Sequence, residues 1–160
     1  MIVSAIEISD LRDQPHFLDV VADRVWRAWW QEQGEALETV AGLFAENLTA
    51  TGALPACLVA HQGNDFIGTA SLIASDLEER PALTPWVAAV WIEPEFRRQR
   101  HGAGIVEAVA ELAFRRGFGQ AYLCAEVDKR SFYAGMGWRL MEENIGPFSL
   151  DVFEKRAPPH

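Results

Sequence analysis

The chain has 160 residues, of which 49% are hydrophobic and 23% are charged, and its formal net charge is -9. This length and apolar content are typical of one globular domain with a hydrophobic core, and they exclude a disordered chain. The negative charge argues against a nucleic-acid groove as the main surface, because binding to a phosphate backbone needs a basic face.

Cysteine and histidine residues are few and scattered. Cys57 and Cys124 do not indicate a disulfide framework, and the four histidines show no metal-ligand spacing, so we expect no metal site. The N-terminal stretch lacks the cationic lead and long apolar run of a signal peptide, and no apolar run is long enough to span a membrane. We therefore expect a cytoplasmic protein without a membrane partner.

The first third of the chain predicts one strand and two helices. Alternating isoleucines predict a strand over residues 2–8, ended by Ser9 and Asp10. Apolar residues at helical spacing then predict helices over residues 14–31 and 35–50.

The first of these helices carries Trp26, Trp29 and Trp30. Because three indoles cannot all face one core, two interpretations stay open. Either one or more of them line a cleft or a subunit contact, or they pack at the edge of the helix.

A hairpin and a polar loop come next. Strands are predicted over residues 57–60 and 66–73, around a Gly-Asn turn. Residues 76–85 read DLEERPALTP and contain two prolines, which predicts a loop. Its acidic residues are either solvated or hold an ammonium group of a substrate. These residues are Asp76, Glu78 and Glu79.

The most informative stretch runs from residue 86 to residue 105 and reads WVAAVWIEPEFRRQRHGAGI. Residues 86–92 are apolar and rich in β-branched side chains, which predicts a buried strand, and Pro94 ends it because proline has no backbone N–H to donate. Apolar residues at helical spacing predict a helix over residues 101–116. A basic turn with two glycines therefore joins a strand to a helix.

This turn has the features of an anion site. The first amides of a helix lack intrahelical partners and lie at the positive end of its dipole, so they bind phosphate oxygens. Gly102 and Gly104 let a ligand approach the backbone, and positive charge comes from Arg97, Arg98 and Arg100. We predict pyrophosphate binding here. The alternative is a helix start with closely packed glycines and solvated arginines, since neither a P-loop nor a Rossmann fingerprint is present.

The last quarter of the chain predicts three strands and a short helix. The strands are expected over residues 121–125, 138–141 and 148–153, with the short helix over residues 128–136 and a connection over residues 142–147. Residues 157–160 are expected to be a frayed tail.

Two segments carry a family resemblance. Residues 94–104 read PEFRRQRHGAG before an amphipathic helix, and residues 128–138 read DKRSFYAGMGW. The first resembles the acetyl-CoA signature of the GNAT superfamily of N-acetyltransferases, an Arg/Gln-x-x-Gly-x-Gly/Ala turn that follows a strand and a proline. The second resembles a later segment of that family, in which a short helix carries Phe-Tyr and ends at Gly-Phe or Gly-Trp.

The signature fits in two registers. In the register counted from Pro94, Arg97 takes the leading Arg/Gln position of the signature. Arg100 then takes the position where the first glycine is usual, and Gly102 takes the position of the second glycine. The other register begins at Gln99 and satisfies the pattern fully. We prefer the first, because its spacing from the proline matches the family. We therefore predict that Arg100 turns outward and pairs with a phosphate of the cofactor.

The resemblance implies an α/β (α+β) fold with a central mixed, mostly antiparallel sheet of about six to seven strands, flanked by about four helices. It implies a splayed strand pair at the cofactor site, one domain over residues 1–156, and acetyl-CoA as acyl donor without a metal. The implied cofactor contacts are Val90, Trp91 and Ile92 by main chain, the turn residues Arg97, Arg98, Gln99, Arg100, His101, Gly102, Ala103 and Gly104, and then Asp128, Ser131 and Tyr133.

The resemblance also implies roles in catalysis. Tyr133 is the candidate general acid, because a phenol with an unperturbed pKa of about 10 can donate its proton to a leaving thiolate. The base is left open between Glu93, Glu126 and the loop residues Glu78 and Glu79. In the family, helices at the position of residues 14–50 form one wall of the acceptor site. The candidate acceptor contacts are Trp29, Glu78, Glu79 and Trp86.

The leading hypothesis is an N-acetyltransferase that acts on a primary amine of a small molecule or peptide, with a homodimer as a possible assembly. An acyl-CoA-binding regulatory module without turnover is the alternative. A nucleotide-binding domain with another cofactor is disfavoured, because a Rossmann fingerprint is lacking and the second motif is present. The acidic surface suits a cationic acceptor, and no nucleic-acid partner is expected.

Overall fold

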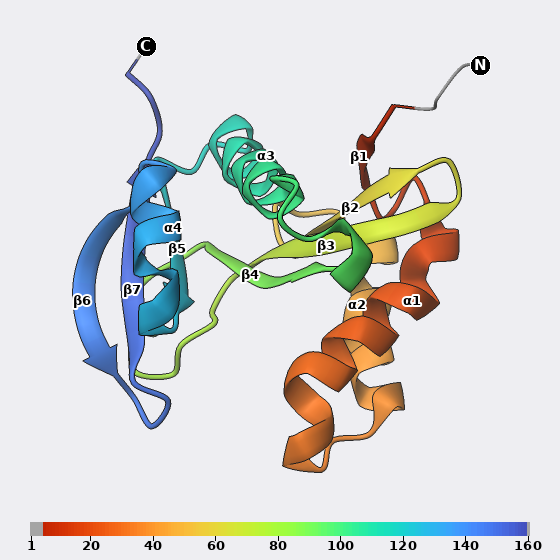
Figure 1. Ribbon diagram of the computed structural model, residues 1–160, viewed down its shortest axis with the longest axis horizontal. Helices are drawn as coiled ribbons and strands as arrows, with labels where there is room; N and C mark the ends of the chain where they lie inside the picture. Colours follow the sequence, from red (N-terminus) through yellow and green to blue (C-terminus); the bar gives the residue numbers. More distant parts are fainter. Residues whose placement is uncertain (1–4, 160) are drawn as a thin grey trace.

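The computed structural model describes residues 5–159, which form a seven-stranded mixed sheet with helices on both faces (Figure 1). The strands are β1 (Glu7–Asp10), β2 (Ala56–Gln62), β3 (Asp65–Ile73), β4 (Trp86–Ile92), β5 (Gln120–Ala125), β6 (Arg139–Ile145) and β7 (Leu150–Arg156). Their order is β1-β2-β3-β4-β5-β7-β6, and every neighbouring pair is antiparallel except β4 and β5. The expected fold class is confirmed.

Four α-helices and five short helical segments complete the fold. The α-helices are α1 (Leu18–Val25), α2 (Leu37–Thr49), α3 (His101–Arg115) and α4 (Arg130–Gly135). The short segments are η1 (Pro15–Phe17), η2 (Trp26–Trp30), η3 (Gln31–Gln33), η4 (Pro94–Phe96) and η5 (Val127–Lys129).

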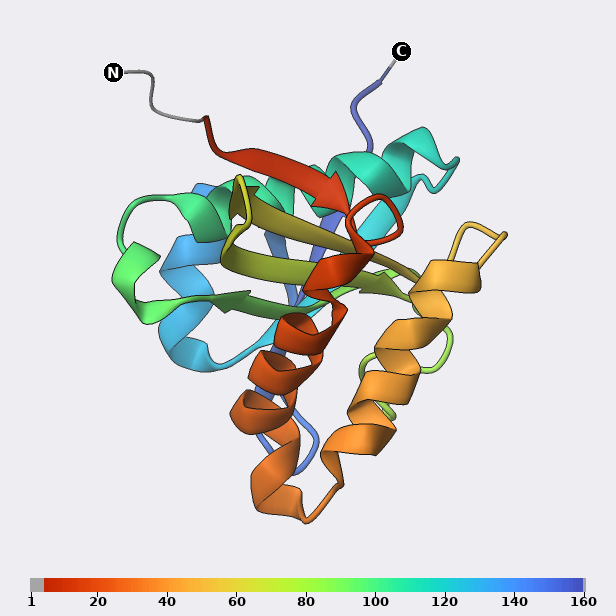
Figure 2. The same ribbon diagram turned by 90° about the vertical axis from the view of Figure 1, so that its right-hand side faces the viewer.

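Strand β2 shows how the two faces of the sheet are covered. Ala56, Leu58 and Ala60 belong to the core under α3, whereas Cys57 and Val59 belong to the core under α1 and α2. This alternation follows from the two-residue period of a strand, and both faces are apolar because helices cover both. Figure 2 shows α1 and α2 on one side of the sheet and α3 on the other.

The predicted first long helix is interrupted. Helix α1 passes into the π-helical segment η2, which contains the three tryptophans, and then into the 3-10 segment η3. One extra residue in a helical turn rotates the following side chains by about 100° relative to an α-helix. Trp26 still packs against the core that contains Val21, Ala22 and Val25, whereas Trp29 and Trp30 are displaced from it and exposed. Gly34 ends the segment in the left-handed conformation, with φ 82°.

Several predicted strands differ in extent from the observed ones; the strand expected over residues 148–153, for example, is Leu150–Arg156. The first was expected over residues 2–8, but β1 is Glu7–Asp10, and residues 1–4 lie outside the described part. Ser9 and Asp10 belong to the strand because they pair with Val59 and Leu58 of β2. Strand β6 continues to Ile145, four residues beyond its expected end, because pairing with β7 offsets its polar sequence.

Candidate active site

The parallel neighbours β4 and β5 separate soon after they meet. Within the described residues they share one bridge, Trp86 with Tyr122, next to a hydrogen bond from the Tyr122 amide to the Pro85 carbonyl (2.9 Å). Beyond this bridge the strands diverge, which confirms the expected splayed pair (Figure 1). The backbone groups of β4 that face the gap therefore have no strand partner there.

A bulge in β4 bends the strand at this point. Thr69 of β3 pairs with Trp91, but Ser71 pairs with Ala88, so Ala89 and Val90 together oppose one residue of β3. Ala89 has a φ of 52°, which is in the left-handed region. A bulge of this kind leaves a residue unpaired and changes the direction of the strand.

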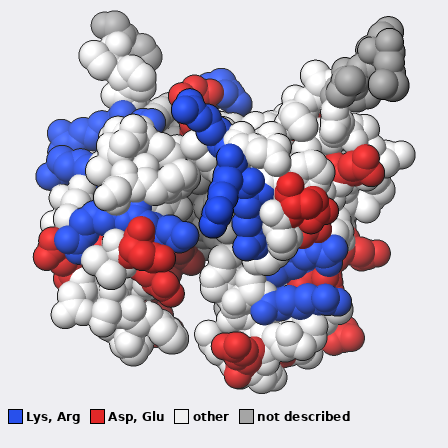
Figure 3. Space-filling view, viewed as in Figure 1, with Lys and Arg blue, Asp and Glu red and all other residues white. Residues whose placement is uncertain are grey.

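The gap between the strands is part of a cleft of about 930 Å³. One side is made by Val87–Val90 of β4 and the opposite side by Leu123–Glu126. The helices η2 and α2 and the turn between β6 and β7 extend the wall further. In Figure 3 the molecule is hollowed between these parts.

The basic turn joins the end of β4 to the start of helix α3. The segment η4 follows β4, and Arg98 (φ 64°) and Arg100 (φ 68°) then adopt the left-handed conformation. Gly104 donates the first hydrogen bond of the helix, to the Arg100 carbonyl at 3.0 Å. The amides of His101, Gly102 and Ala103 precede this bond and lack intrahelical acceptors.

The N-terminus of α3 contains no group that neutralises its dipole. There is no side-chain cap and no acidic residue in its first turn. A helix of 15 residues that begins in this way favours an anion from outside the chain. These observations fit the pyrophosphate of a CoA-type ligand.

The four polar side chains of the turn differ in their contacts. Arg97 folds back onto β4: its Nε donates to the Ile92 carbonyl (2.8 Å), and its guanidinium lies over the Trp91 ring (4.7 Å). Gln99 donates to the Glu95 carbonyl. Arg98 and Arg100 are exposed and make no hydrogen bond or ion pair within residues 5–159. Figure 3 shows a column of Lys and Arg side chains down the middle of this face.

Gly102 has free space around it. A Cβ atom there would lie 3.8 Å from the Ile92 side chain and 3.9 Å from Phe132, which are ordinary contacts. Its φ is not in the left-handed region either. The protein itself therefore does not require glycine here, and the remaining reason for it is the approach of a ligand.

Tyr133 reaches the cleft from α4. Its ring is buried against Phe153 and Phe132, whereas its hydroxyl has no hydrogen-bond partner in the described chain. Burial raises the pKa of the phenol, so it stays protonated near neutral pH. A neutral donor with an unused hydrogen bond suits the predicted role of general acid.

The other predicted cofactor contacts lie in three places. Val90 lines the cleft, whereas Trp91 and Ile92 continue β4 toward the basic turn. Asp128 of η5 and Ser131 of α4 are exposed and do not line the cleft.

The predicted bases separate into two groups. Glu126 lines the cleft, at the end of β5. Glu93 does not: it is buried and accepts hydrogen bonds from Arg24 Nε (2.9 Å) and from the Trp91 indole (3.2 Å). Glu93 thus joins α1 to the end of β4. The structure does not bring it to the cleft, so it has no access to an acceptor there.

The predicted acceptor residues are also divided. Trp29 lines the cleft, but Glu78 and Glu79 do not, and the Glu79 carboxyl group lies near Gly146. Trp86 is fully buried, packs against Tyr122, and donates its indole N–H to the Leu83 carbonyl at 2.6 Å. Its assignment as an acceptor contact is therefore corrected: Trp86 is part of the core.

Several residues of the cleft were missed as functional candidates. They are Trp30, Leu43, Asn47, Ser71, Cys124 and Phe148. Only Trp30 had a sequence signal, its place in the tryptophan cluster. The others come from four separate elements, namely α2, β3, β5 and the turn between β6 and β7, and no local pattern connects them. Asp76 was noted as an acid of the loop, and the structure places it in the cleft, where the Cys124 thiol donates to its carboxylate at 3.4 Å.

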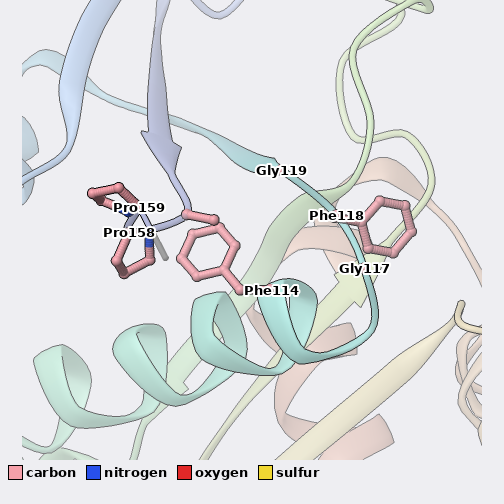
Figure 4. A pocket seen from close by; sticks show the side chains of 7 residues that line it. Phe114, Gly117, Phe118, Gly119, Pro158 and Pro159 are labelled. Carbon is pink, nitrogen blue, oxygen red and sulfur yellow. The ribbon is translucent and has the colours of Figure 1, made fainter.

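A second hollow, of about 360 Å³, lies at the other end of α3. Figure 4 shows the Phe114 ring next to Pro158 and Pro159, with Gly117, Phe118 and Gly119 on its other side. The Ala157 amide donates to the Gly119 carbonyl at 2.9 Å. Ala157 is thus held to the domain, whereas Pro158 and Pro159 are exposed and have no regular secondary structure, and His160 lies outside the described residues.

Two features are absent from the described residues. Residues 5–159 contain no group of three or more His, Cys, Asp or Glu side chains placed to hold a metal ion. No helix within that range is long and apolar enough to cross a membrane.

Comparisons with known proteins agree with this geometry. The model of the acetyltransferase (GNAT) family matches residues 18–138. No curated protein matches the chain.

Three similar solved structures share the fold at low sequence identity. An aminoglycoside 6'-N-acetyltransferase complexed with coenzyme A has a TM-score of 0.72 at 18% identity, over 96% of this chain and 98% of the other. The PaiA N-acetyltransferase of Thermoplasma acidophilum, in complex with coenzyme A, has a TM-score of 0.64 at 17% identity, over 96% and 99%. An acetyltransferase of Streptococcus agalactiae has a TM-score of 0.68 at 17% identity, over 95% and 98%. On the strength of the family match across most of its length, the chain belongs to the GNAT family of acetyltransferases.

Proposed function

We propose that this protein transfers the acetyl group of acetyl-CoA to a primary amine, by direct attack of the amine within a ternary complex. One observation carries the proposal: Tyr133, whose hydroxyl has no hydrogen-bond partner within residues 5–159, lines the cleft between the separated strands β4 and β5. Support also comes from the two similar N-acetyltransferases whose structures contain coenzyme A.

The basic turn is the proposed site of the pyrophosphate. The amides of His101, Gly102 and Ala103 donate to its oxygens, and the unpaired guanidinium groups of Arg98 and Arg100 add charge-assisted contacts. Arg97 holds the turn against β4 through the Ile92 carbonyl.

The unpaired edge of β4 is the proposed site of the pantetheine arm. Acetyl-CoA supplies an activated thioester, and the bulge at Ala89 and Val90 directs backbone groups of β4 toward it. A fixed thioester next to a fixed amine removes much of the entropic barrier to their reaction.

The proposed reaction transfers the acetyl group from the sulfur of CoA to the nitrogen of the amine. The amine nitrogen forms a bond to the thioester carbon, and the carbon–sulfur bond breaks. Tyr133 donates its proton to the departing thiolate and recovers one from the amine through solvent of the cleft. An acceptor that arrives as an ammonium ion loses two protons in total: one ends on the thiol of CoA and the other is released to solvent.

The test is a titration of the purified protein with acetyl-CoA, with NADH and ATP as controls, followed by thermal unfolding and calorimetry. A ligand at a hundredfold its Kd stabilises a fold by about 2.7 kcal/mol, which is readily measured. We expect a shift with acetyl-CoA that neither control reproduces, followed by amine-dependent thiol release. No shift at millimolar acetyl-CoA would overturn the proposal.

A further inference from the structure

Exposed hydrophobic side chains gather around the cleft, where they form its apolar wall. Within residues 5–159, eight large hydrophobic side chains are exposed, and four of them line the cleft. These four are Trp29 (43% exposed), Trp30 (36%), Leu43 (49%) and Phe148 (70%). They come from η2, α2 and the turn between β6 and β7. Such a concentration indicates a surface that an apolar ligand covers.

The charge of the cleft has the opposite sign to that of the basic turn. Its charged lining residues are the acids Glu46, Asp76 and Glu126 and the single cation Lys129. An excess of carboxylates favours a cationic ligand over an anionic one. The ligand of this wall is therefore chemically different from the pyrophosphate.

Two buried polar groups on the same wall have unused hydrogen-bonding capacity. Asn47 is 5% exposed, and its Nδ2 donates to the Phe44 carbonyl (3.1 Å), but its Oδ1 has no partner within the described chain. Ser71 is 4% exposed, and its Oγ lies near the Cys57 thiol without a hydrogen bond of regular geometry. Buried polar atoms without partners are rare, and in a ligand cleft they indicate a polar contact with the ligand.

Asp76 lies where an ammonium group would meet the catalytic end of the cleft. Its carboxylate accepts from Cys124 of β5, which lines the same cleft as Tyr133. Glu79 of the same loop adds a further negative charge near Cys124. Asp76 is thus an acid of the cleft that is linked by a direct contact to the neighbourhood of the proposed general acid.

Resting on the proposed function, we infer that the acceptor is a primary amine carried on an aromatic or bulky apolar body. Its ammonium group binds Asp76, and its apolar part covers Trp29, Trp30, Leu43 and Phe148. A free arylalkylamine and the N-terminus of a peptide with an apolar first residue share this chemistry. Polyamines and sugar amines lack the apolar part and leave that wall exposed.

The first test is calorimetric binding to the protein saturated with CoA, which cannot turn over. The probes are 2-phenylethylamine, 1,4-diaminobutane as an amine without an apolar body, and 2-phenylethanol as a body without the charge. We expect 2-phenylethylamine to bind at least about tenfold more tightly than either, which corresponds to about 1.4 kcal/mol. Phenylalaninamide distinguishes the two sources, because it binds more tightly than 2-phenylethylamine if peptides are the natural acceptors.

The second test uses variants with matched controls. Leu43→Ala removes an exposed side chain of the wall, and Ile8→Ala removes a similarly exposed one (41%) from the edge strand β1. Asp76→Asn removes the proposed ammonium contact, and Asp65→Asn removes a carboxyl group of the β2–β3 hairpin. We expect Leu43→Ala and Asp76→Asn each to weaken 2-phenylethylamine about tenfold, while the controls and the CoA affinity change by less than about twofold.

The outcomes separate this inference from the function on which it rests. If acetyl-CoA binds and 1,4-diaminobutane is bound or acetylated in preference to 2-phenylethylamine, the acceptor class is wrong and the acetyltransferase stands. Equal losses in Leu43→Ala and Ile8→Ala would also overturn the acceptor class. If acetyl-CoA does not bind, the proposed function fails and the acceptor class fails with it.

Discussion

The basic turn and the proposed acceptor wall differ in almost every respect. The acceptor wall is the surface of the cleft that carries Trp29, Trp30, Leu43 and Phe148. The turn consists of neighbouring residues, Arg97 to Gly104, and offers backbone amides and positive charge. The acceptor wall combines side chains from η2, α2, β3 and the β6–β7 turn, and its charged groups are mostly carboxylates. The turn therefore suits a ligand part that is the same in every acyl-CoA, whereas the wall suits one particular amine.

The difference indicates that cofactor binding and acceptor choice depend on different parts of the proposed site. Backbone amides at a helix N-terminus bind phosphate whatever the side chains are, so the turn depends on local conformation. The wall depends on side chains that only the packing of α1 and α2 against the sheet brings together. Changes in the turn should alter cofactor affinity, and changes in the wall should alter acceptor choice.

Tyr133→Phe tests whether the two regions meet at a catalytic group, and it has the largest expected effect. Loss of the acid should lower kcat for thiol release by about 10²–10⁴-fold. The ring contacts with Phe153 remain, so the acetyl-CoA affinity should change by less than about twofold.

The control is Tyr122→Phe, because Tyr122 packs on Trp86 away from the cleft. Stopped assays of thiol release and calorimetry measure both quantities. Unchanged turnover in Tyr133→Phe would remove the general acid from the mechanism. Binding of acetyl-CoA without turnover in either protein would favour the regulatory module instead.

Gly102→Ala sharpens the role of the turn. The added methyl group meets no protein atom closer than 3.8 Å, and alanine favours a helix over glycine by up to about 1 kcal/mol. We expect the melting temperature to hold or rise while acetyl-CoA binds about tenfold more weakly. Gly42→Ala in α2, which has no neighbour within 4 Å, should be equally stable and bind normally. Equal acetyl-CoA affinity in both variants would show that ligand approach does not require Gly102.

The effect of Asp76→Asn on the pH dependence of stability tests the environment of Asp76 in the cleft. Asp76 is exposed at the mouth of the cleft, but the protein atoms around its carboxyl group exclude part of the solvent, and this desolvation raises its pKa from 3.8 to about 6, with the Cys124 hydrogen bond acting in the opposite direction. The folded protein thus holds this proton more tightly than the unfolded chain, so stability is lost as pH rises from about 4 to 6. At pH 7 Asp76→Asn should therefore melt at a higher temperature than the parent, with little difference near pH 4.

The same variant should alter activity in the other direction. If ionised Asp76 binds the ammonium group, kcat/KM for 2-phenylethylamine falls several-fold as pH drops below about 6, and this limb is absent in Asp76→Asn. Thermal melts and initial rates from about pH 4 to 8 measure both effects. A parent pH profile that is flat through 6 would contradict the assignment.

Arg100→Gly has the smallest expected effect and tests the departure from the usual signature. Arg100 has a φ of 68°, a conformation that costs an L-residue about 1–2 kcal/mol and glycine little. The variant should be more stable but bind acetyl-CoA a few-fold more weakly, and the loss should shrink at high salt. Calorimetry at two salt concentrations measures this. Tighter binding in Arg100→Gly would show that the arginine obstructs the site.

Much of the fold was predictable because its signals are local. Alternation and helical spacing placed β2 to β5, α2 and α3 close to their observed bounds, and the Gly-Asn turn placed the hairpin. The N-terminal strand was misplaced because β1 is chosen by pairing with β2 rather than by its own pattern. The π-helical turn at Trp26–Trp30 has no distinct sequence signal either.

The basic turn and the helix that follows it were predictable from contiguous residues, whereas the place of Tyr133 was implied by the resemblance of residues 128–138 to the family segment. Only the tertiary structure decided that Trp86 and Glu93 are structural, because their partners Leu83, Tyr122 and Arg24 are identified by packing. Tertiary packing likewise brought Asp76, Asn47 and Leu43 to one cleft. A local pattern specifies backbone conformation, whereas a binding surface depends on which distant side chains the folded chain places side by side.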